Sequence, residues 1–179
     1  MMLMNRQLIR AALSVALILT CNIGASYGQD SYDEADILMK LFQETKGFKW
    51  KQKDGWAQAD SVCDWYGVTC FSADEQGDRR NHVATLDLSE NKLVGTLPQE
   101  IFKLKHMVSF VLRDNPDLQV SLTNIGSATS LKHLTVSNTE LSSFDGIVAV
   151  KHKLTQLHVT DCEIGGTIPS EIFQLTRLE

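Results

Sequence analysis

Several features of enzymes and membrane proteins are missing from this chain of 179 residues. It has no phosphate-binding glycine loop, no His-Glu-x-x-His zinc motif and no Cys-x-x-Cys pair. Its 17 Lys and Arg against 22 Asp and Glu give a net charge of −5, which argues against a nucleic-acid partner. With 3 Pro and 11 Gly, collagen-like and proline-rich architectures are excluded. An apolar fraction of 43% with 22% charged residues excludes disorder and a polytopic membrane protein.

Acidic residues are also missing from residues 1–28, which differ in kind from the rest. Arg6 and Arg10 precede an apolar run over 11–20, and small residues follow over 24–28. That order predicts a secretory signal peptide, cleaved after Gly28 or, alternatively, after Ser26. Ten apolar residues span roughly 15 Å as a helix, about half of a bilayer's hydrocarbon core, so a membrane-spanning helix is the weaker interpretation.

Export makes disulfides permissible, and the chain has 4 cysteines. Cys21 falls in the signal peptide; a bacterial lipoprotein site there is a poor match, because Thr20 replaces the usual small residue. Cys63 and Cys70, seven positions apart around a Trp and a Gly, indicate a local disulfide. The alternative, a zinc site, would need two more soft ligands, and His82 is the nearest imidazole. Cys162 is then left as a free thiol.

The mature chain begins with a helical pattern followed by tryptophans. Residues 33–46 place apolar side chains on one face, and Gly47 is positioned to end the helix. Trp50, Trp56 and Trp65 follow, and we expect them to fill the core. The segment 74–81 is polar, contains a Gly and predicts a loop. We expect residues 29–82 to form one N-terminal unit.

The rest of the chain repeats. Units begin at residues 83, 107, 131 and 154, which are 24, 24 and 23 positions apart. In the first unit the repeated positions are Leu86, Leu88, Asn91, Leu93, Gly95, Leu97, Pro98, Ile101 and Leu104. Two apolar residues separated by one place both side chains on one face of a strand, and successive units then stack in parallel. Asn91, Asn115, Thr139 and Cys162 occupy the turn after each strand, where an amide or similar group can bond backbone groups of adjacent turns.

This pattern resembles the plant-type subclass of leucine-rich repeat proteins, over about residues 33–179. The stretch 63–70 with its preceding helix resembles the family's N-terminal cap, and residues 93–98 and 164–169 resemble its second-strand motif; the two middle units lack that motif. The resemblance implies an α/β fold, a right-handed solenoid with a helical, disulfide-closed N-terminal cap. It also implies a receptor-like ectodomain or a secreted inhibitor-type protein. Leu175 and Leu178 begin the pattern of a further unit, so we expect either a natural chain that continues beyond Glu179 or one that pairs its open end with another copy.

Alternation along each strand sends a second set of side chains away from the core, onto what would be the concave face of the solenoid. We predict that this face binds a protein, peptide or glycan partner. Its members, three to a unit, are Thr85, Asp87, Ser89, Ser109, Val111, Arg113, His133, Thr135, Ser137, Gln156, His158 and Thr160. Asp87 and Arg113, in neighbouring units, are candidates for a surface salt bridge.

Function is therefore predicted to be recognition without catalysis, cofactor or metal. Catalysis by Cys162 would need a base, and His158 lies four residues away across a strand and turn, where helical spacing does not apply. His133 and His158 lack an acidic third ligand for a metal. We expect a secreted protein or one on the extracellular face of the plasma membrane, with membrane attachment only if a longer chain carries an anchor. The main alternative is the ectodomain fragment of a receptor-like transmembrane protein; an enzyme is less favoured.

Overall fold

The computed structural model describes residues 33–72, 79–162, 164 and 170–179, all within the unit Tyr32–Glu179. The predicted signal peptide, with Cys21, lies outside the described residues. So do residues 74–78 of the polar loop and most of the second-strand motif of the fourth unit.

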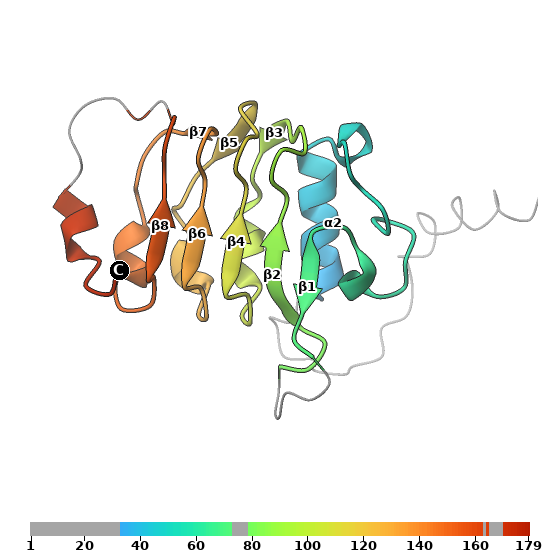
Figure 1. The fold of residues 1–179 in the computed structure, drawn as a ribbon, viewed down its shortest axis with the longest axis horizontal. Helices are drawn as coiled ribbons and strands as arrows, with labels where there is room; N and C mark the ends of the chain where they lie inside the picture. The colour runs from blue at the N-terminus through green and yellow to red at the C-terminus, as the bar shows by residue number, and fades with distance from the viewer. Residues whose placement is uncertain (1–32, 73–78, 163, 165–169) are drawn as a thin grey trace, which may run out of the picture. The chain divides into compact units, whose positions relative to one another are not determined.

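Five short strands form the larger sheet, which runs the length of the described unit (Figure 1). They are β1 (Val68–Cys70), β2 (Val83–Asp87), β4 (Ser109–Val111), β6 (His133–Thr135) and β8 (Gln156–His158), in that order. The last four are parallel, with Leu86, Phe110, Leu134 and Leu157 side by side, and β1 is antiparallel to β2. The predicted units therefore stack strand on strand in the expected register.

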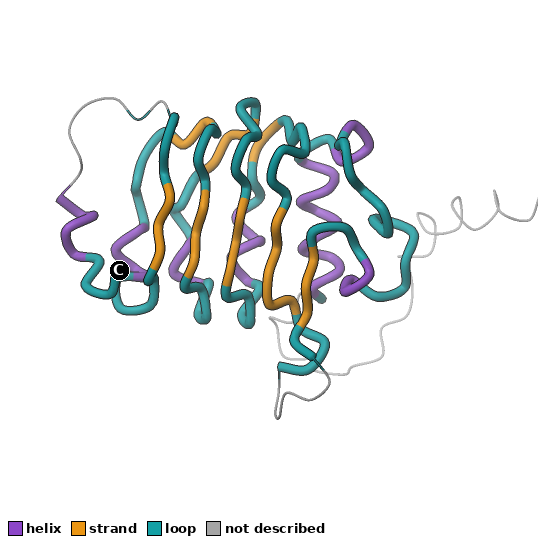
Figure 2. Tube along the Cα trace, in the orientation of Figure 1, coloured by secondary structure: helices purple, strands orange, loops and turns teal. Residues whose placement is uncertain are grey.

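A second sheet and a series of 3₁₀ helices lie behind the first sheet (Figure 2). The strands β3 (Gly95–Thr96), β5 (Leu118–Val120) and β7 (Glu140–Leu141) pair in parallel. The 3₁₀ helices of the repeats are Gln99–Lys103, Ile125–Ser127, Ile147–Val150 and Ser170–Gln174. The two middle units form β5 and β7 without the Gly-x-Leu-Pro motif, so this side of the fold does not depend on that motif in every unit.

The core lies between these layers and consists of the repeated apolar residues. Leu86, Leu88, Phe110, Leu134 and Val136 are fully buried. Burying one such side chain contributes about 1.5–3 kcal/mol. Each is covered on both sides, by neighbouring units or, for the first unit, by the N-terminal segment with β1, so a single unit could not bury these side chains alone. In the fourth unit the equivalent Leu157 and Val159 are only half-buried.

Besides Lys92 in the first turn, non-glycine residues take the left-handed conformation at one fixed position of the turns that follow β2, β4, β6 and β8. These are Glu90, Asp114, Asn138 and Asp161, with φ between 51° and 59°, each three residues after the last residue of its strand. Asn and Asp are the non-glycine residues that adopt this conformation most readily. The turn thus ends the strand at the same point in every unit.

The N-terminal helix, α2, runs Glu34–Glu44, shorter at both ends than the predicted 33–46. Asp33 is its N-cap, and the carboxylate accepts the Ala35 N–H. The expectation that Gly47 ends the helix was wrong, because Lys46 takes the left-handed conformation (φ 55°) and a 3₁₀ turn, Gly47–Lys49, follows. Gly47 is instead a close-approach site, since a Cβ there would lie 2.1 Å from Phe42 Cδ2.

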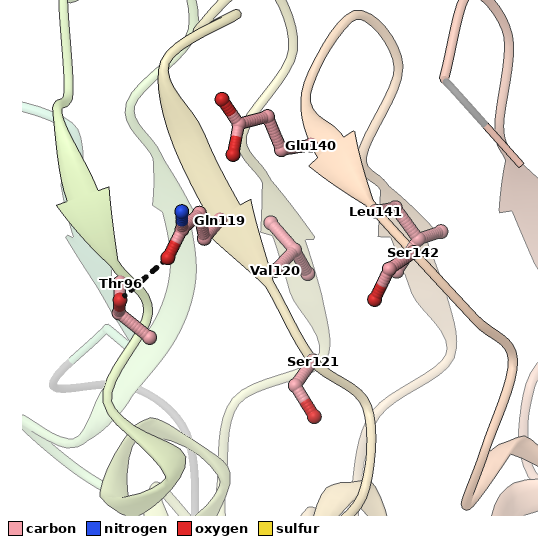
Figure 3. Close-up of a pocket in the computed structure, with 7 residues that line it drawn as sticks. All are labelled: Thr96, Gln119, Val120, Ser121, Glu140, Leu141 and Ser142. Carbon is pink, nitrogen blue, oxygen red and sulfur yellow. Dashed lines mark hydrogen bonds between the residues drawn. The ribbon is translucent and has the colours of Figure 1, made fainter.

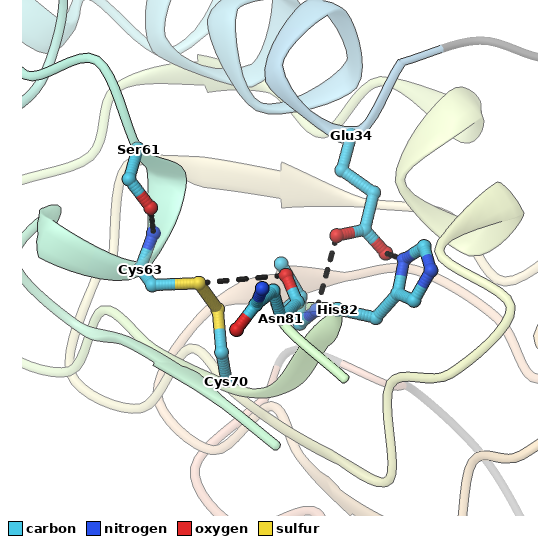
Figure 4. Close-up of a disulfide and its surroundings, with 7 residues drawn as sticks. Glu34, Ser61, Cys63, Cys70, Asn81 and His82 are labelled. Atoms are coloured by element: carbon cyan, nitrogen blue, oxygen red, sulfur yellow. Dashed lines mark hydrogen bonds and ion pairs between the residues drawn. A yellow bond between two sulfur atoms is a disulfide. The ribbon is translucent and has the colours of Figure 1, made fainter. Parts of the chain in front are cut away.

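Aromatic rings fill the space between α2 and the first strands. Trp50, Trp56 and Trp65 are buried, as predicted, and Trp56 contacts both other tryptophans and Phe42, with ring centroids 4.8–5.7 Å apart. Indole N–H groups of Trp50 and Trp56 donate to backbone carbonyls. Beside this cluster, the 3₁₀ turn Val62–Asp64 leads into the Cys63–Cys70 disulfide, which closes onto β1 (Figure 4). The predicted disulfide is confirmed.

Candidate functional site

Two rows of side chains cross the outer face of the larger sheet, the face that turns away from the core. The strand register aligns Thr85, Ser109, His133 and Gln156 in one row, and Asp87, Val111, Thr135 and His158 in the other. Because every residue between them points into the core, the two rows are held at fixed positions by buried leucines and phenylalanine. All eight side chains are half-buried or exposed.

The turn position after each strand forms a third row, and here one residue departs from the expected exposure. Arg113 and Thr160 are exposed and Ser89 is half-buried, but Ser137 is buried. Its hydroxyl oxygen accepts the Thr160 N–H at 3.1 Å, so Ser137 joins the third unit to the fourth. The prediction that it lies open to a partner needs correction.

Polar contacts on this face are short and mostly local. The Asp87 carboxylate accepts both the N–H and the hydroxyl of Ser89, at 3.0 and 2.6 Å, and His133 Nδ1 lies 2.8 Å from Gln156 Oε1. The expected Asp87–Arg113 pair is not formed: Arg113 instead lies 3.5 Å from Glu90 and 3.2 Å from Asp114. Both of these partners come from the left-handed turns, whose geometry brings carboxylates closer to Arg113 than a strand residue can come.

The predicted turn ladder contains a buried amide that links two units. Asn115 Nδ2 donates to the carbonyls of Leu88 and Leu112, and Oδ1 accepts the N–H groups of Asn91 and Leu93, all between 2.8 and 3.2 Å. This one side chain therefore satisfies four buried backbone groups, three of them in the preceding unit. Asn91 extends the ladder toward the N-terminus by exchanging two bonds with the backbone of Gln52.

Farther along, Thr139 and Cys162 occupy the same turn position with weaker groups. The Thr139 hydroxyl donates to the Val136 carbonyl at 2.6 Å, and the Cys162 thiol lies 3.1 Å from the same carbonyl. Cys162 is a free, half-buried thiol. The contacts of Cys162 within the described residues are with backbone carbonyls and Thr139, and none is with the exposed imidazole of His158. No group of three or more metal-ligating residues occurs in the described part of the chain.

A pocket that the repeat pattern did not point to lies on the second sheet. It encloses about 460 Å³ and is lined by residues of β3, β5, β7 and the segments after them (Figure 3). Thr96 donates to Gln119 Oε1 at 3.0 Å, and Glu140 follows in the same row. Sequence reasoning missed this pocket because β5 and β7 carry no motif that marks them as strands.

The described groups with a shifted pKa lie away from both sheets' outer faces, between α2 and the first repeat. Lys40 Nζ lies 2.9 Å from Glu100 Oε1 and 3.7 Å from Glu44. The hydrogen bond to Glu100 is the main cause that raises the pKa of Lys40, and the same bond lowers the pKa of Glu100. This ion pair joins α2 to the first repeat, and its two side chains are engaged with each other.

Comparison with known families agrees with this architecture. The family profile described as Leucine Rich Repeat matches residues 82–104 and 153–175, which are the first and fourth units. The chain contains leucine-rich repeats. No curated protein matches this chain in sequence.

Solved structures of plant proteins share the fold. A plant ice-binding protein aligns with a TM-score of 0.67 at 23% identity, over 80% of this leucine-rich repeat chain and 45% of that protein. The BIR3–SERK2 complex from Arabidopsis thaliana gives 0.63 at 25% identity, over 82% and 78%. PEPR1–AtPEP1 gives 0.61 at 21%, over 81% of this chain and 20% of that one. The chain thus spans less than half of the first and a fifth of the last. The chain is thus similar in fold to plant proteins, in agreement with the plant-type pattern of its repeats. Among the described residues, no helix is long and apolar enough to cross a bilayer.

Proposed function

We propose that this protein is a secreted or cell-surface recognition module that binds a protein, peptide or glycan partner without catalysis. The observation that carries the proposal is the regular outer face of the larger sheet. Two aligned rows of mainly polar, accessible side chains cross four parallel strands on a rigid base. A shallow surface of this kind suits hydrogen bonds to an extended partner.

Structural relatives favour a protein or peptide among these partner classes. Two of them are complexes, one between BIR3 and SERK2 and one between PEPR1 and AtPEP1. We propose that this chain binds a partner of the same general kind, on the concave side of a right-handed solenoid whose repeat strands, β2, β4, β6 and β8, are parallel. Residues 83–179 then form the binding repeats, and residues 29–82, with α2 and the disulfide, form the N-terminal cap. Residues 1–28 act as the signal peptide.

A receptor-like ectodomain is the second candidate, and it differs from a free secreted protein only in what the natural chain contains beyond these residues. The two relatives named above favour it by fold. A full-length transcript that encodes a spanning helix after the repeats would decide for the ectodomain. A stop codon after a few further repeats would decide for the secreted module.

The proposed binding face is tested by exchanging charges on it. Asp87→Lys with Arg113→Glu keeps the net charge and alters the outer face of the larger sheet. Glu140→Lys with Lys92→Glu keeps the net charge and alters exposed positions elsewhere. Each protein is screened against panels of secreted peptides and receptor ectodomains by surface plasmon resonance. We expect the first exchange to weaken a partner's binding by tenfold or more, roughly the value of one charged hydrogen bond, and the second to leave it unchanged. Equal binding by both would remove the concave face from the proposal.

A further inference from the structure

The two edges of the larger sheet differ in charge. We call the edge where β2, β4, β6 and β8 begin the strand-start edge, and the opposite one the strand-end edge (Figure 1). Turns at the strand-end edge carry the acids Glu90, Asp114, Asp117 and Asp161 against the two bases Lys92 and Arg113, so acids predominate there. The segments 126–132 and 146–155, which lead into β6 and β8, contain no Asp or Glu and carry lysines and a histidine. In a chain with a net charge of −5 this separation leaves one edge basic.

A cavity of about 370 Å³ lies within this basic edge. Its lining has five basic side chains and no carboxylate: Arg79, Lys132, His152, Lys153 and Arg177, with Val108, Thr129, Ser130 and Thr155 between them. No ion pair within the described residues includes Lys132, Lys153 or Arg177. Their charges are therefore available to a ligand.

Acidic residues near the edge do not neutralise it. Glu34 is engaged by His82, at 3.2 Å, and by the Val83 N–H. Glu179, whose N–H donates to the Thr155 carbonyl, is the acid next along the chain to Arg177. Glu179 has a side-chain and an α-carboxylate in this chain, but neither belongs to the lining, which has five basic groups.

The cations make the pocket mainly a donor surface, and its threonine hydroxyls offer a ligand acceptor lone pairs only. The Thr129 and Thr155 hydroxyls already donate to the carbonyls of Lys105 and Lys132. Lys and Arg are donors only, and an ionised carboxylate is an acceptor only. A carboxylate therefore pairs with the Lys and Arg side chains in charge as well as in hydrogen bonds, whereas a neutral sugar hydroxyl, which can also accept, brings no charge to them.

From these observations we infer that the strand-start edge binds an acidic polypeptide segment of the partner, with its carboxylates in the pocket. The lining residues Val108, Lys132 and Thr155 immediately precede β4, β6 and β8, so the pocket spans two strand spacings, about 10 Å. An extended peptide rises about 3.3 Å per residue, so roughly three to four residues fit. The segment carries two or three acidic side chains within that length. A flat bilayer surface is disfavoured because the basic groups line a hollow.

This inference rests on the proposed function for the partner itself, but the pocket is testable alone with a synthetic probe. The full chain is titrated against a labelled glutamate-rich decapeptide, and against the same peptide with glutamines, by fluorescence anisotropy. We expect saturable binding of the glutamate peptide that weakens with salt, and none of the glutamine peptide. Alginate and phosphatidylserine vesicles serve as the other polyanion classes, and preferential binding of either would overturn the assignment.

A charge-reversal pair with a matched control locates the site. Lys132→Glu with Lys153→Glu removes two pocket cations, and Lys49→Glu with Lys92→Glu makes the same change in net charge at exposed positions outside the lining. We expect the two pocket substitutions to weaken peptide binding by about tenfold or more, and the two control substitutions to change it by less than about twofold. Circular dichroism confirms that both proteins fold. Equal weakening by the two pairs would mean attraction by net charge alone and would overturn the site.

The two proposals fail separately. If the peptide binds in the pocket but the Asp87→Lys, Arg113→Glu protein still captures the partner normally, the concave face is wrong and the edge site stands. If partner capture depends on the concave face but the glutamate peptide does not bind, the edge site is wrong and the proposed function stands.

Discussion

The first two repeats and the last two are joined by different chemistry at the same turn position. Asn115 sends an amide into the preceding unit, where it bonds the Leu88 carbonyl and two N–H groups. The equivalent Cys162 reaches the equivalent carbonyl, that of Val136, with a thiol, which is a weak donor and accepts no backbone N–H there. Strand pairing is the same in both halves. A comparison of the two turn positions therefore measures how much a buried side chain adds to the free energy of unfolding beyond the pairing of the strands.

The N-terminal end of the repeats is also covered by structure that the C-terminal end lacks among the described residues. Its end is covered by the tryptophan cluster, the disulfide and the antiparallel strand β1. In the fourth unit Leu157, Val159 and Cys162 are half-buried where their counterparts in the first unit are fully buried. We therefore expect stability to fall along the described repeats, from the first unit to the fourth.

The largest effect is expected at the amide. Asn115→Ala leaves four buried backbone groups without partners, at about 1–3 kcal/mol each before relaxation, so the free energy of unfolding should drop by about 4 kcal/mol. Cys162→Ala should lower it by less than about 1 kcal/mol. Urea titration followed by tryptophan fluorescence measures both.

Asn124→Ala is the matched control, because Asn124 is exposed and its side chain makes no hydrogen bond among the described residues. It should change the free energy of unfolding by less than about 0.5 kcal/mol. A loss at Cys162 as large as at Asn115 would show that the two halves are joined equally strongly.

A middle-sized effect is expected from opening the disulfide. Cys63→Ser with Cys70→Ser frees a loop with a sequence separation of 7 and should lower the free energy of unfolding by about 2.5 kcal/mol in the chain-entropy model. Hydrogen exchange would localise the loss to β1 and β2 and leave β6 unchanged, since the disulfide lies at one end. Equal faster exchange in β6 would contradict the idea that the N-terminal closure acts locally.

The smallest effect is expected at the Lys40–Glu100 pair, which joins α2 to the first repeat. The pKa of Glu100 is lowered from 4.5 in the folded state, so its stabilisation is present above that pH and is lost as the pH falls through the folded pKa. Glu100→Gln should therefore lower stability slightly at pH 7, by less than about 1 kcal/mol, and this deficit should shrink as the pH falls through the folded pKa of Glu100. Thermal unfolding over a series of decreasing pH values tests this, with Glu140→Gln as a control; a deficit that does not shrink with falling pH would exclude the ionic origin.

Repetition made most of the architecture predictable from sequence. The two-residue alternation and the period near two dozen predicted β2, β4, β6 and β8 and their shared register, because each leucine has the same environment in every unit. The disulfide followed from two closely spaced thiols in an exported chain. These features depend on residues close in sequence or on a regular repeat, and both can be recognised in a single sequence.

Features that depend on turn geometry were not predictable in the same way. Arg113 pairs with Glu90 and Asp114 because left-handed turns redirect those carboxylates, and Ser137 is buried because it bonds the next turn. The second sheet in the middle units and the basic pocket arise from segments without a motif. Their positions become visible only when the units are stacked.

The left-handed residue after each strand has a consequence for the surface as a whole. Asn and Asp are favoured there by the backbone, and in this chain acids occupy three of the four positions, so part of the negative charge at the strand-end edge follows from the turns themselves. No such conformational demand acts on the lysines at the opposite rim. Sequence differences between related chains at the basic edge should therefore reflect differences in their ligands more directly than differences at the acidic edge.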